Sequence, residues 1–209
     1  VQGPDAWLQD QEAFLKHAER NGLGERQTRH TLQSVPPERR VRRGGVVVAR
    51  TEVRLSALAL QQDGRILVGG SFTTFNGDDR AGIVRLHTNG LTDLSFTVGA
   101  GANATVYAVA LQDDGKIVIG GEFTAVQGQP RFRIARLLRN GALDSTFNTV
   151  MDAAVRTLLV QADGGIVAGG SFTTVNSVSR NRLARFNPDG TLDAGFLASP
   201  LSGADNVVL

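Results

Sequence analysis

Two arginine positions and one aspartate position recur at fixed spacing, and these residues are the best placed to do chemistry. The first arginine stands in a loop, at Arg80, Arg131 and Arg180. The second stands in a strand-like segment, at Arg85, Arg136 and Arg185. An aspartate follows the second arginine eight residues later, at Asp93, Asp144 and Asp193. Planar guanidinium groups bind carboxylates, phosphates and sulfates through paired hydrogen bonds, so one interpretation is an arginine-lined surface for an anionic polymer.

Repetition in every copy favours a structural role for the strand arginine and its aspartate. A ligand site usually occupies one place, whereas contacts that build a repeat recur with it. We therefore predict that each strand arginine pairs with the aspartate of its own copy or caps backbone groups of a turn. The loop arginines Arg80, Arg131 and Arg180 are retained as candidate binding residues.

No catalytic residue, metal site or cofactor is expected. The chain has no cysteine, which excludes disulfides and thiolate ligands, and its histidines (His17, His30 and His87) share no spacing with other ligand types. Alternating oxygen donors in 187–193 resemble a calcium loop, but no glutamate follows at the twelfth place. A hairpin turn with aspartate accepting backbone N–H groups explains this stretch better.

These residues recur because the chain contains three copies of one unit. Residues 55–96, 106–147 and 155–196 align without a gap, and 207–209 resemble the opening of a fourth copy. Each copy carries two turn signals between strand-like runs, and the run 117–119 predicts a strand covered on both faces. The first turn, which predicts a type I′ hairpin, is Asp63–Gly64, Asp114–Gly115 and Asp163–Gly164. Four strands in about 50 residues is the size of a propeller blade.

Paired glycines and two phenylalanine positions are expected to build the blade. A glycine pair inside a strand marks a bulge or a close approach of a neighbouring blade. The pairs are Gly69–Gly70, Gly120–Gly121 and Gly169–Gly170. The phenylalanines are Phe72, Phe123 and Phe172, then Phe96, Phe147 and Phe196. Each phenylalanine buries roughly 150–250 Å², so we interpret them as core filler rather than as a ligand platform.

These motifs resemble the delta-60 repeat, a bacterial family of unknown function with propeller-like repeats. The resemblance rests on Ala108-Val-Ala-Leu-Gln-Asp-Asp-Gly-Lys-Ile-Val-Ile-Gly-Gly-Glu-Phe-Thr124, on 134–137 with 140–147, and on 187–196. It extends over residues 53–209, and the first copy departs from it at Thr92, where Leu143 and Leu192 stand in the others. The resemblance implies a secreted or surface-attached protein and supplies no catalytic residue.

The first 50 residues carry no repeat. A helix is expected over 4–18, with Asp5 as its N-cap, followed by an arginine-rich linker that includes Arg39–Arg43. That basic run is interpreted as solvated linker, with a nucleic-acid or membrane patch as the alternative. The net charge is only +2, so no nucleic-acid partner is expected. No apolar run approaches the roughly 20 residues of a transmembrane segment.

The sequence thus predicts an all-β, β-propeller-like fold of three consecutive four-stranded blades. Closed propellers have at least four blades, so three blades form an open arc or fragment of a longer chain, or complete a ring by self-association. The leading hypothesis is a non-catalytic scaffold of a secreted or surface protein, hence extracellular, that binds a protein or a surface polymer. The alternatives are a propeller enzyme, or a carbohydrate- or polyanion-binding propeller, whose site is completed by blades absent here.

Overall fold

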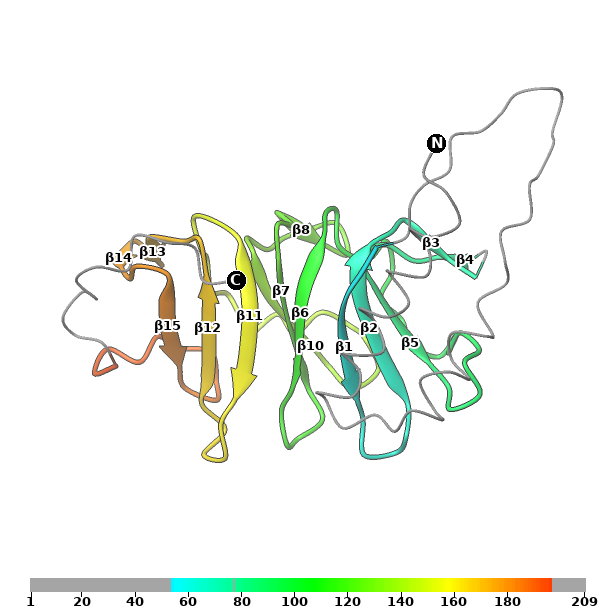
Figure 1. Ribbon diagram of the computed structural model, residues 1–209. Coiled ribbons are helices and arrows are strands. Elements are labelled where there is room, and N and C mark those ends of the chain that lie inside the picture. The colour runs from blue at the N-terminus through cyan, green and yellow to red at the C-terminus, as the bar shows by residue number, and fades with distance from the viewer. Residues whose placement is uncertain (1–53, 77, 197–209) are drawn as a thin grey trace, which may run out of the picture.

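A computed structural model describes residues 54–76 and 78–196, which form three small antiparallel sheets side by side (Figure 1). The described residues form strands and turns without a helix, which confirms the expected all-β, propeller-like fold. None of them forms a helix long and apolar enough to cross a membrane. The helix and linker expected in residues 1–50, and the fourth-copy opening at 207–209, lie outside the described residues.

Each sheet contains three main strands and is termed blade 1, 2 or 3 in chain order. Blade 1 holds β1 (Arg54–Leu60), β2 (Ile66–Ser71) and β5 (Ile83–Leu86); blade 2 holds β6 (Val106–Leu111), β7 (Ile117–Gly121) and β10 (Ile134–Leu137); blade 3 holds β11 (Val155–Val160), β12 (Ile166–Gly170) and β15 (Leu183–Phe186). The middle strand of every sheet pairs antiparallel with both others. The first strands of adjacent blades also contact one another, so β6 lies between β1 and β11.

The expected fourth strand of each blade is reduced to one bridging residue. The bridges are Leu86 to Thr92, Leu137 to Leu143 and Phe186 to Leu192. The strand ends there because the following aspartate turns the chain. In blade 2, the Asp144 carboxylate accepts the backbone N–H of Thr146, two residues later, at 2.9 Å. A side chain that captures a nearby backbone donor in this way competes with sheet pairing.

Each blade also contains a second, small hairpin. It lies where the sequence analysis expected only the loop that carries Arg80, Arg131 or Arg180. The hairpins are β3 (Thr74–Phe75) with β4 (Asp78–Asp79), β8 (Ala125–Val126) with β9 (Gln129–Pro130), and β13 (Thr174–Val175) with β14 (Val178–Ser179). Figure 1 shows all three at the same end of the blades, termed the hairpin end. The Asp-Gly turns lie at the opposite end, termed the turn end.

The predicted type I′ geometry of the Asp-Gly turns is wrong. Gly115 has a φ of 79°, but Asp114 is not in the left-handed region that a type I′ turn requires of both residues. Gln112 and Lys116 close the loop instead, and the Gly115 N–H bonds the Gln112 carbonyl. The Asp114 carboxylate accepts the Lys116 backbone N–H at 3.0 Å, so only the glycine must adopt a positive φ. This is the longer hairpin loop with glycine at its left-handed position.

The two glycines of each pair have different structural roles. A Cβ on the second, Gly121, would overlap the backbone oxygen of Thr105, so this glycine permits a close backbone approach. The strand pairing shifts register there, between Val106 and Ala108, as a β-bulge does. A Cβ on the first, Gly120, would lie 2.5 Å from Val155 of the next blade. The first glycine therefore lets neighbouring blades pack closely.

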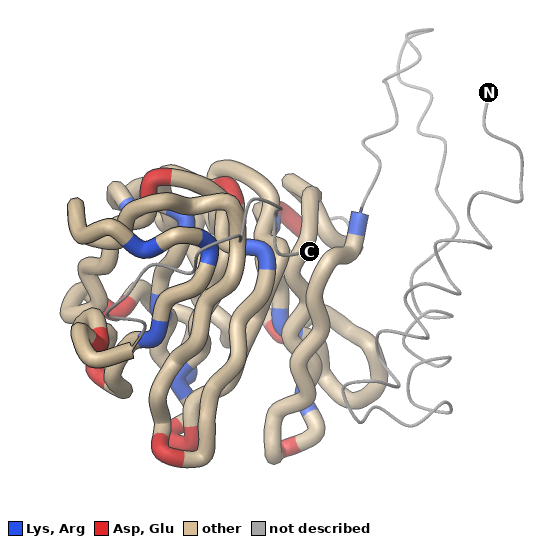
Figure 2. The backbone as a smooth tube through the Cα atoms, turned by 60° about the vertical axis from the view of Figure 1, so that its left-hand side comes forward, with Lys and Arg blue, Asp and Glu red and all other residues tan. Residues whose placement is uncertain are grey.

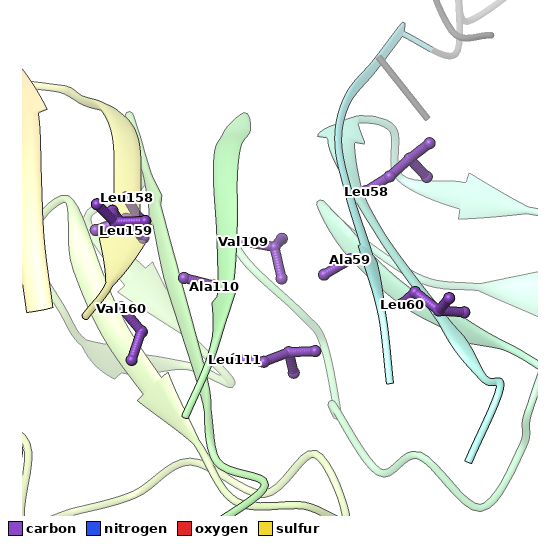
Figure 3. A pocket seen from close by; sticks show the side chains of 9 residues that line it. All are labelled: Leu58, Ala59, Leu60, Val109, Ala110, Leu111, Leu158, Leu159 and Val160. Atoms are coloured by element: carbon purple, nitrogen blue, oxygen red, sulfur yellow. The ribbon is translucent and has the colours of Figure 1, made fainter. Parts of the chain in front are cut away.

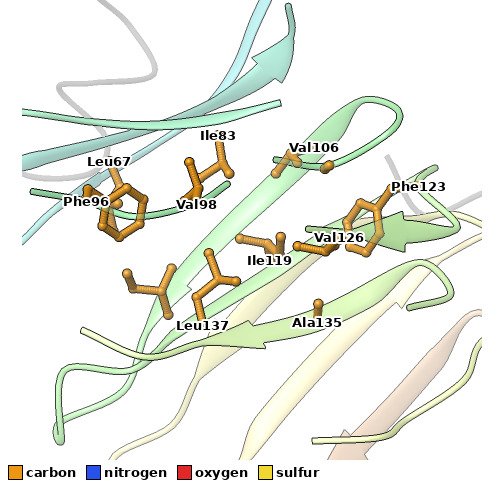
Figure 4. Close-up of a cluster of buried hydrophobic side chains, with 12 residues drawn as sticks. Leu67, Ile83, Phe96, Val98, Val106, Ile119, Phe123, Val126, Ala135 and Leu137 are labelled. Carbon is orange, nitrogen blue, oxygen red and sulfur yellow. The ribbon is translucent and has the colours of Figure 1, made fainter. Parts of the chain in front are cut away.

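Two of the three hydrophobic clusters lie between blades, and the third, which contains Val68, Phe72 and Val84, consists of blade 1 residues. Blade 1 contributes Leu67, Ile83 and Phe96 to one cluster, and blade 2 covers them with residues that include Ile119 and Phe123 (Figure 4). A second cluster joins blade 2 to blade 3 in the same way and contains Phe147, Phe172 and Met151. Burying these faces against one another is the main stabilising term, at about 25 cal/mol per Å² of apolar surface. A single blade would leave both of its faces in water.

Candidate functional site

The recurring arginine and aspartate form buried ion pairs in blades 1 and 2. Nε of Arg85 donates to Oδ2 of Asp93 at 2.8 Å, and Arg136 pairs with Asp144 at the same distance. All four residues are buried. Each guanidinium also lies over a phenylalanine ring, Arg85 at 4.6 Å from the centre of Phe96. Arg136 lies 5.0 Å from the Phe147 ring in the same arrangement. These pairs belong to the interior and not to a ligand surface.

The same arginines bind the next blade. Nη1 of Arg85 donates to the backbone carbonyl of Arg139 at 2.6 Å, in the second turn of blade 2. Nη1 of Arg136 donates to the carbonyl of Pro188 at 2.7 Å, in the second turn of blade 3. Each of these two guanidinium groups therefore links the aspartate of its own blade to a turn of the next blade. In blade 3, Arg185 binds Asp193, Gln161 and Asp163 within its own blade.

The buried aspartates are held in their charged form. Burial alone would raise the pKa of the Asp144 carboxyl, but hydrogen bonds from Thr146 and Arg136 outweigh it and the pKa lies below its ordinary value. Asp93 shows the same balance, with Ser95 and Arg85 as its donors. A general acid or base near neutral pH needs a pKa close to the working pH. These carboxylates are therefore structural anions rather than proton-transfer groups.

The loop arginines, here termed the rim arginines (Arg80, Arg131 and Arg180), each follow the small hairpin of their blade. The backbone N–H of Arg131 bonds the Thr124 carbonyl at 3.0 Å and closes the hairpin. Its Nη1 donates to the carbonyl of Pro130 at 2.7 Å, and the other two rim arginines bond their preceding residue likewise. Nε of all three is buried and has no hydrogen-bond partner among the described residues. Figure 2 shows basic and acidic positions interspersed rather than segregated in the view it gives.

A polar cluster of Tyr107, Glu122, Arg133 and Arg156 was missed by the sequence analysis. The Arg156 guanidinium of blade 3 lies 4.8 Å from the centre of the Tyr107 ring of blade 2. Burial and the Glu122 carboxylate raise the pKa of the Tyr107 hydroxyl. Arg133 donates to the Glu122 carbonyl and has a φ of 70°, which is strained for a residue other than glycine. All four side chains are at least partly exposed.

The signal that would have found this polar cluster is variation between copies. The bulged position at the start of the first strand is Ser56 in blade 1, Tyr107 in blade 2 and Arg156 in blade 3. The position of Glu122 is serine in the other two copies, at Ser71 and Ser171. A search for recurring residues passes over such positions.

The first strands of the three blades line a groove of about 240 Å³ (Figure 3). Figure 3 shows Val109 and Leu111 pointing from β6 toward β1, and Ala110 pointing toward β11. Leu159 of β11 is 59% exposed there. The side chains lining the groove are all aliphatic, namely Leu58, Ala59, Leu60, Val109, Ala110, Leu111, Leu158, Leu159 and Val160. The groove therefore offers aliphatic side chains and polar backbone groups, but no polar side chain.

The oxygen-rich stretch 187–193 has internal partners for its carboxylates. Asp189 accepts the backbone N–H and the hydroxyl of Thr191, at 2.8 and 2.7 Å. Asp193 accepts hydrogen bonds from Arg185 and from the Gly195 backbone. Within residues 54–76 and 78–196, no three His, Asp or Glu side chains are grouped as metal ligands would be.

Comparison with known proteins gives one family match. The family model described as a domain of unknown function (DUF5122) beta-propeller matches residues 61–96, 112–147 and 161–196, just over half of the chain. No curated protein matches. This chain is also similar to a protein of unknown function from Bacteroides caccae whose crystal structure is known. The two sequences are 11% identical, the match covers 70% of this chain and 68% of the Bacteroides caccae chain, and the TM-score is 0.35. That score is too low to support a conclusion about this chain.

Proposed function

This chain belongs to the DUF5122 β-propeller family, whose function is unknown, and from that premise we propose that it is a non-catalytic interaction module of a bacterial secreted or surface protein. The contrast between recurring and varying polar residues carries the proposal. Recurring residues such as Arg136 and Asp144 are buried in contacts that join blades. The polar cluster around Tyr107 and Arg156 varies between blades and is partly exposed. Variation between blades allows one blade to present contacts to a partner that the other blades do not present.

Lack of catalysis is part of this proposal. The two buried carboxylates, Asp93 and Asp144, have lowered pKa values, accept several hydrogen bonds and stay charged. Their geometry supports a role in holding blades together. The proposed partners are a protein or a surface polymer, together with further blades or a second copy of the chain.

The proposed location is tested by immunolabelling of intact cells. An antibody raised against the purified chain should label bacteria that produce the protein without permeabilising them, or should detect the protein in the culture medium. A cytoplasmic enzyme followed in parallel should stay inaccessible to its own antibody. Detection confined to the cytoplasmic fraction would refute a secreted or surface location.

A second candidate function is binding of an anionic polysaccharide by the rim arginines. Two observations favour it: each rim arginine is partly exposed, and the three arginines recur beside the hairpins. Guanidinium groups bind sulfate or carboxylate oxygens through charge-assisted hydrogen bonds. Blades arranged in an arc would present such groups at regular intervals to a repeating polymer.

Heparin chromatography tests this candidate. The variant R80Q/R131Q/R180Q should elute at a salt concentration lower by about 0.1 M or more, because exposed charge contacts are screened by salt. The variant R65Q/K116Q/R139Q removes the same number of charges from the turn end and should elute near wild type. Equal retention of both variants would show that only net charge matters. Failure of the wild-type chain to bind heparin would exclude this candidate.

A further inference from the structure

The polar cluster at the junction of blades 2 and 3 differs from its counterpart at the junction of blades 1 and 2. Its four positions, Tyr107, Glu122, Arg133 and Arg156, correspond in the repeat to Ser56, Ser71, Gly82 and Tyr107 at the earlier junction. The earlier junction therefore has no charged side chain at these positions, whereas the polar cluster has two guanidinium groups and one carboxylate. Contacts that only build the repeat would recur at both junctions. The polar cluster is therefore a specialised feature of one junction.

The polar cluster lies at the hairpin end of the blades. There β7 ends and β6, β10 and β11 begin (Figure 1). Tyr107 and Arg156 are the second residues of β6 and β11, Glu122 directly follows β7, and Arg133 directly precedes β10. All four residues are at least partly exposed. A ligand that approaches the hairpin end can therefore reach side chains from both blades.

Hydrogen bonds of the backbone fix the cluster before any ligand binds. The Glu122 N–H bonds the Thr105 carbonyl at 2.9 Å, and the Arg133 N–H bonds the Phe123 carbonyl at the same distance. The Arg133 guanidinium also donates to the Glu122 carbonyl. Arg133 has a φ of 70°, a conformation that its blade 1 counterpart Gly82 adopts at a φ of 71° without strain. Such preorganisation lowers the entropic cost of binding.

The cluster combines hydrogen-bond donors for an anion with an acceptor for hydroxyl groups. The face of the Arg156 guanidinium lies over the Tyr107 ring, and its N–H groups lie in the guanidinium plane, where they can meet a carboxylate. Burial, together with the hydrogen bond and the charge of Glu122, raises the pKa of the Tyr107 hydroxyl. This hydroxyl therefore stays protonated at neutral pH and can donate. The exposed Glu122 carboxylate only accepts hydrogen bonds.

The size and the charge of the cluster indicate the class of ligand. Four side chains at one junction are far fewer than the roughly 20–30 residues that each partner contributes to a stable protein interface. A few placed polar groups are typical of a site for one small unit. Two arginines and one glutamate leave a net charge of +1, which matches a unit with a single negative charge. Glu122 would repel a unit with several negative charges, such as a multiply sulfated sugar.

We propose that the polar cluster binds one uronic acid residue of an acidic polysaccharide. Arg133 and Arg156 supply donors to the sugar carboxylate, and Glu122 accepts a hydrogen bond from a sugar hydroxyl. This inference rests on the proposed function, because it names a ligand for the interaction module. It differs from the binding candidate at the rim arginines. Those arginines recur in every blade and would follow any polyanion, whereas the polar cluster occurs at one described junction and recognises a sugar residue.

Isothermal titration calorimetry with tetramers of galacturonic, glucuronic and mannuronic acid as probes tests the site. At least one of these tetramers should bind the wild-type chain, whereas the uncharged maltotetraose should not. Arg133→Gly and Arg156→Gln should each weaken binding about 10-fold, because each removes charged hydrogen bonds. Arg139→Gln removes one positive charge from the turn end and should bind like wild type. Arg133→Gly installs the residue that blade 1 has, so its melting temperature should not fall.

Three outcomes would overturn this inference. The wild-type chain could bind none of the three uronate tetramers at about 10 mM. Arg133→Gly and Arg156→Gln could both bind as tightly as wild type, and loss of binding only in R80Q/R131Q/R180Q would then assign the uronate to the rim arginines. A tetraglutamate peptide could bind as tightly as the best uronate, which would show a site for any chain of carboxylates. Failure of the proposed location is seen separately, since immunolabelling confined to the cytoplasm would leave these binding results unchanged.

Discussion

Replacing Asp144 with alanine is expected to destabilise the protein by about 3–5 kcal/mol, because it leaves the buried Arg136 guanidinium without its carboxylate. Arg136 is held in place by Pro188 of the next blade and by the Phe147 ring, so it does not reach water easily. The Thr146 hydroxyl and backbone lose the same acceptor. Urea unfolding followed by fluorescence or circular dichroism measures the change in the free energy of unfolding.

The matched control is Asp193→Ala, which removes the same residue type from the same position in blade 3. Its side chain is 23% exposed, and its partner Arg185 also binds Gln161 and Asp163. A partly exposed ion pair contributes about 1 kcal/mol or less, so the expected loss is several-fold smaller. Equal losses at both positions would contradict a special role for burial.

Acid should mimic the Asp144→Ala substitution in the wild-type protein. The pKa of the Asp144 carboxyl is lower in the folded protein than its value of about 3.9 in the unfolded chain. The stabilisation is therefore fully present above about pH 5 and is lost as the pH falls below about 4 toward the folded pKa. The Asp144→Ala variant lacks this contribution and should lose less stability over the same range. A parallel loss in both proteins would show that other carboxylates dominate.

The repeat made the blade and its internal ion pair predictable. Arg136 and Asp144 stand on antiparallel segments joined by one turn, so a spacing of eight residues brings them together. The second partner of Arg136 was not predictable in this way. Pro188 lies 52 residues further along the chain, and its carbonyl carries no side-chain signal. Because a backbone carbonyl makes this contact, any residue type at position 188 could supply it.

The turn geometry and the polar cluster could not be predicted from the sequence, for other reasons. Asp114 remains outside the left-handed region because its carboxylate can cap the Lys116 N–H, an option the Asp-Gly dipeptide alone does not reveal. The Tyr107–Arg156 contact joins two blades through residues that do not recur. Positions that build the fold can be recognised in the sequence because they recur in every copy. Positions that distinguish one blade from another can be recognised only when the structure shows which of them lie side by side.

Replacing Gly121 with alanine is expected to destabilise the protein by about 3 kcal/mol, because the new Cβ would overlap the Thr105 carbonyl oxygen. That oxygen accepts the Glu122 backbone N–H at 2.9 Å, so moving it breaks the bulge that joins β6 and β7. Val106 and Phe123, which neighbour this contact, are fully buried, and their close packing limits how far the backbone can relax. Thermal or urea unfolding measures the loss.

Gly128→Ala is the matched control, since a Cβ on Gly128 meets nothing within 4 Å. Its φ of 73° still makes alanine unfavourable there, at a cost of about 1 kcal/mol. Gly121 has no positive φ, so the loss in Gly121→Ala reports the steric overlap, whereas the loss in Gly128→Ala reports backbone conformation. If Gly121→Ala destabilised the protein no more than Gly128→Ala, β7 would have to shift relative to β6 without an energetic cost. The close approach at the second glycine, which recurs at Gly70 and Gly170, would then not be what holds the first two strands of each blade in register.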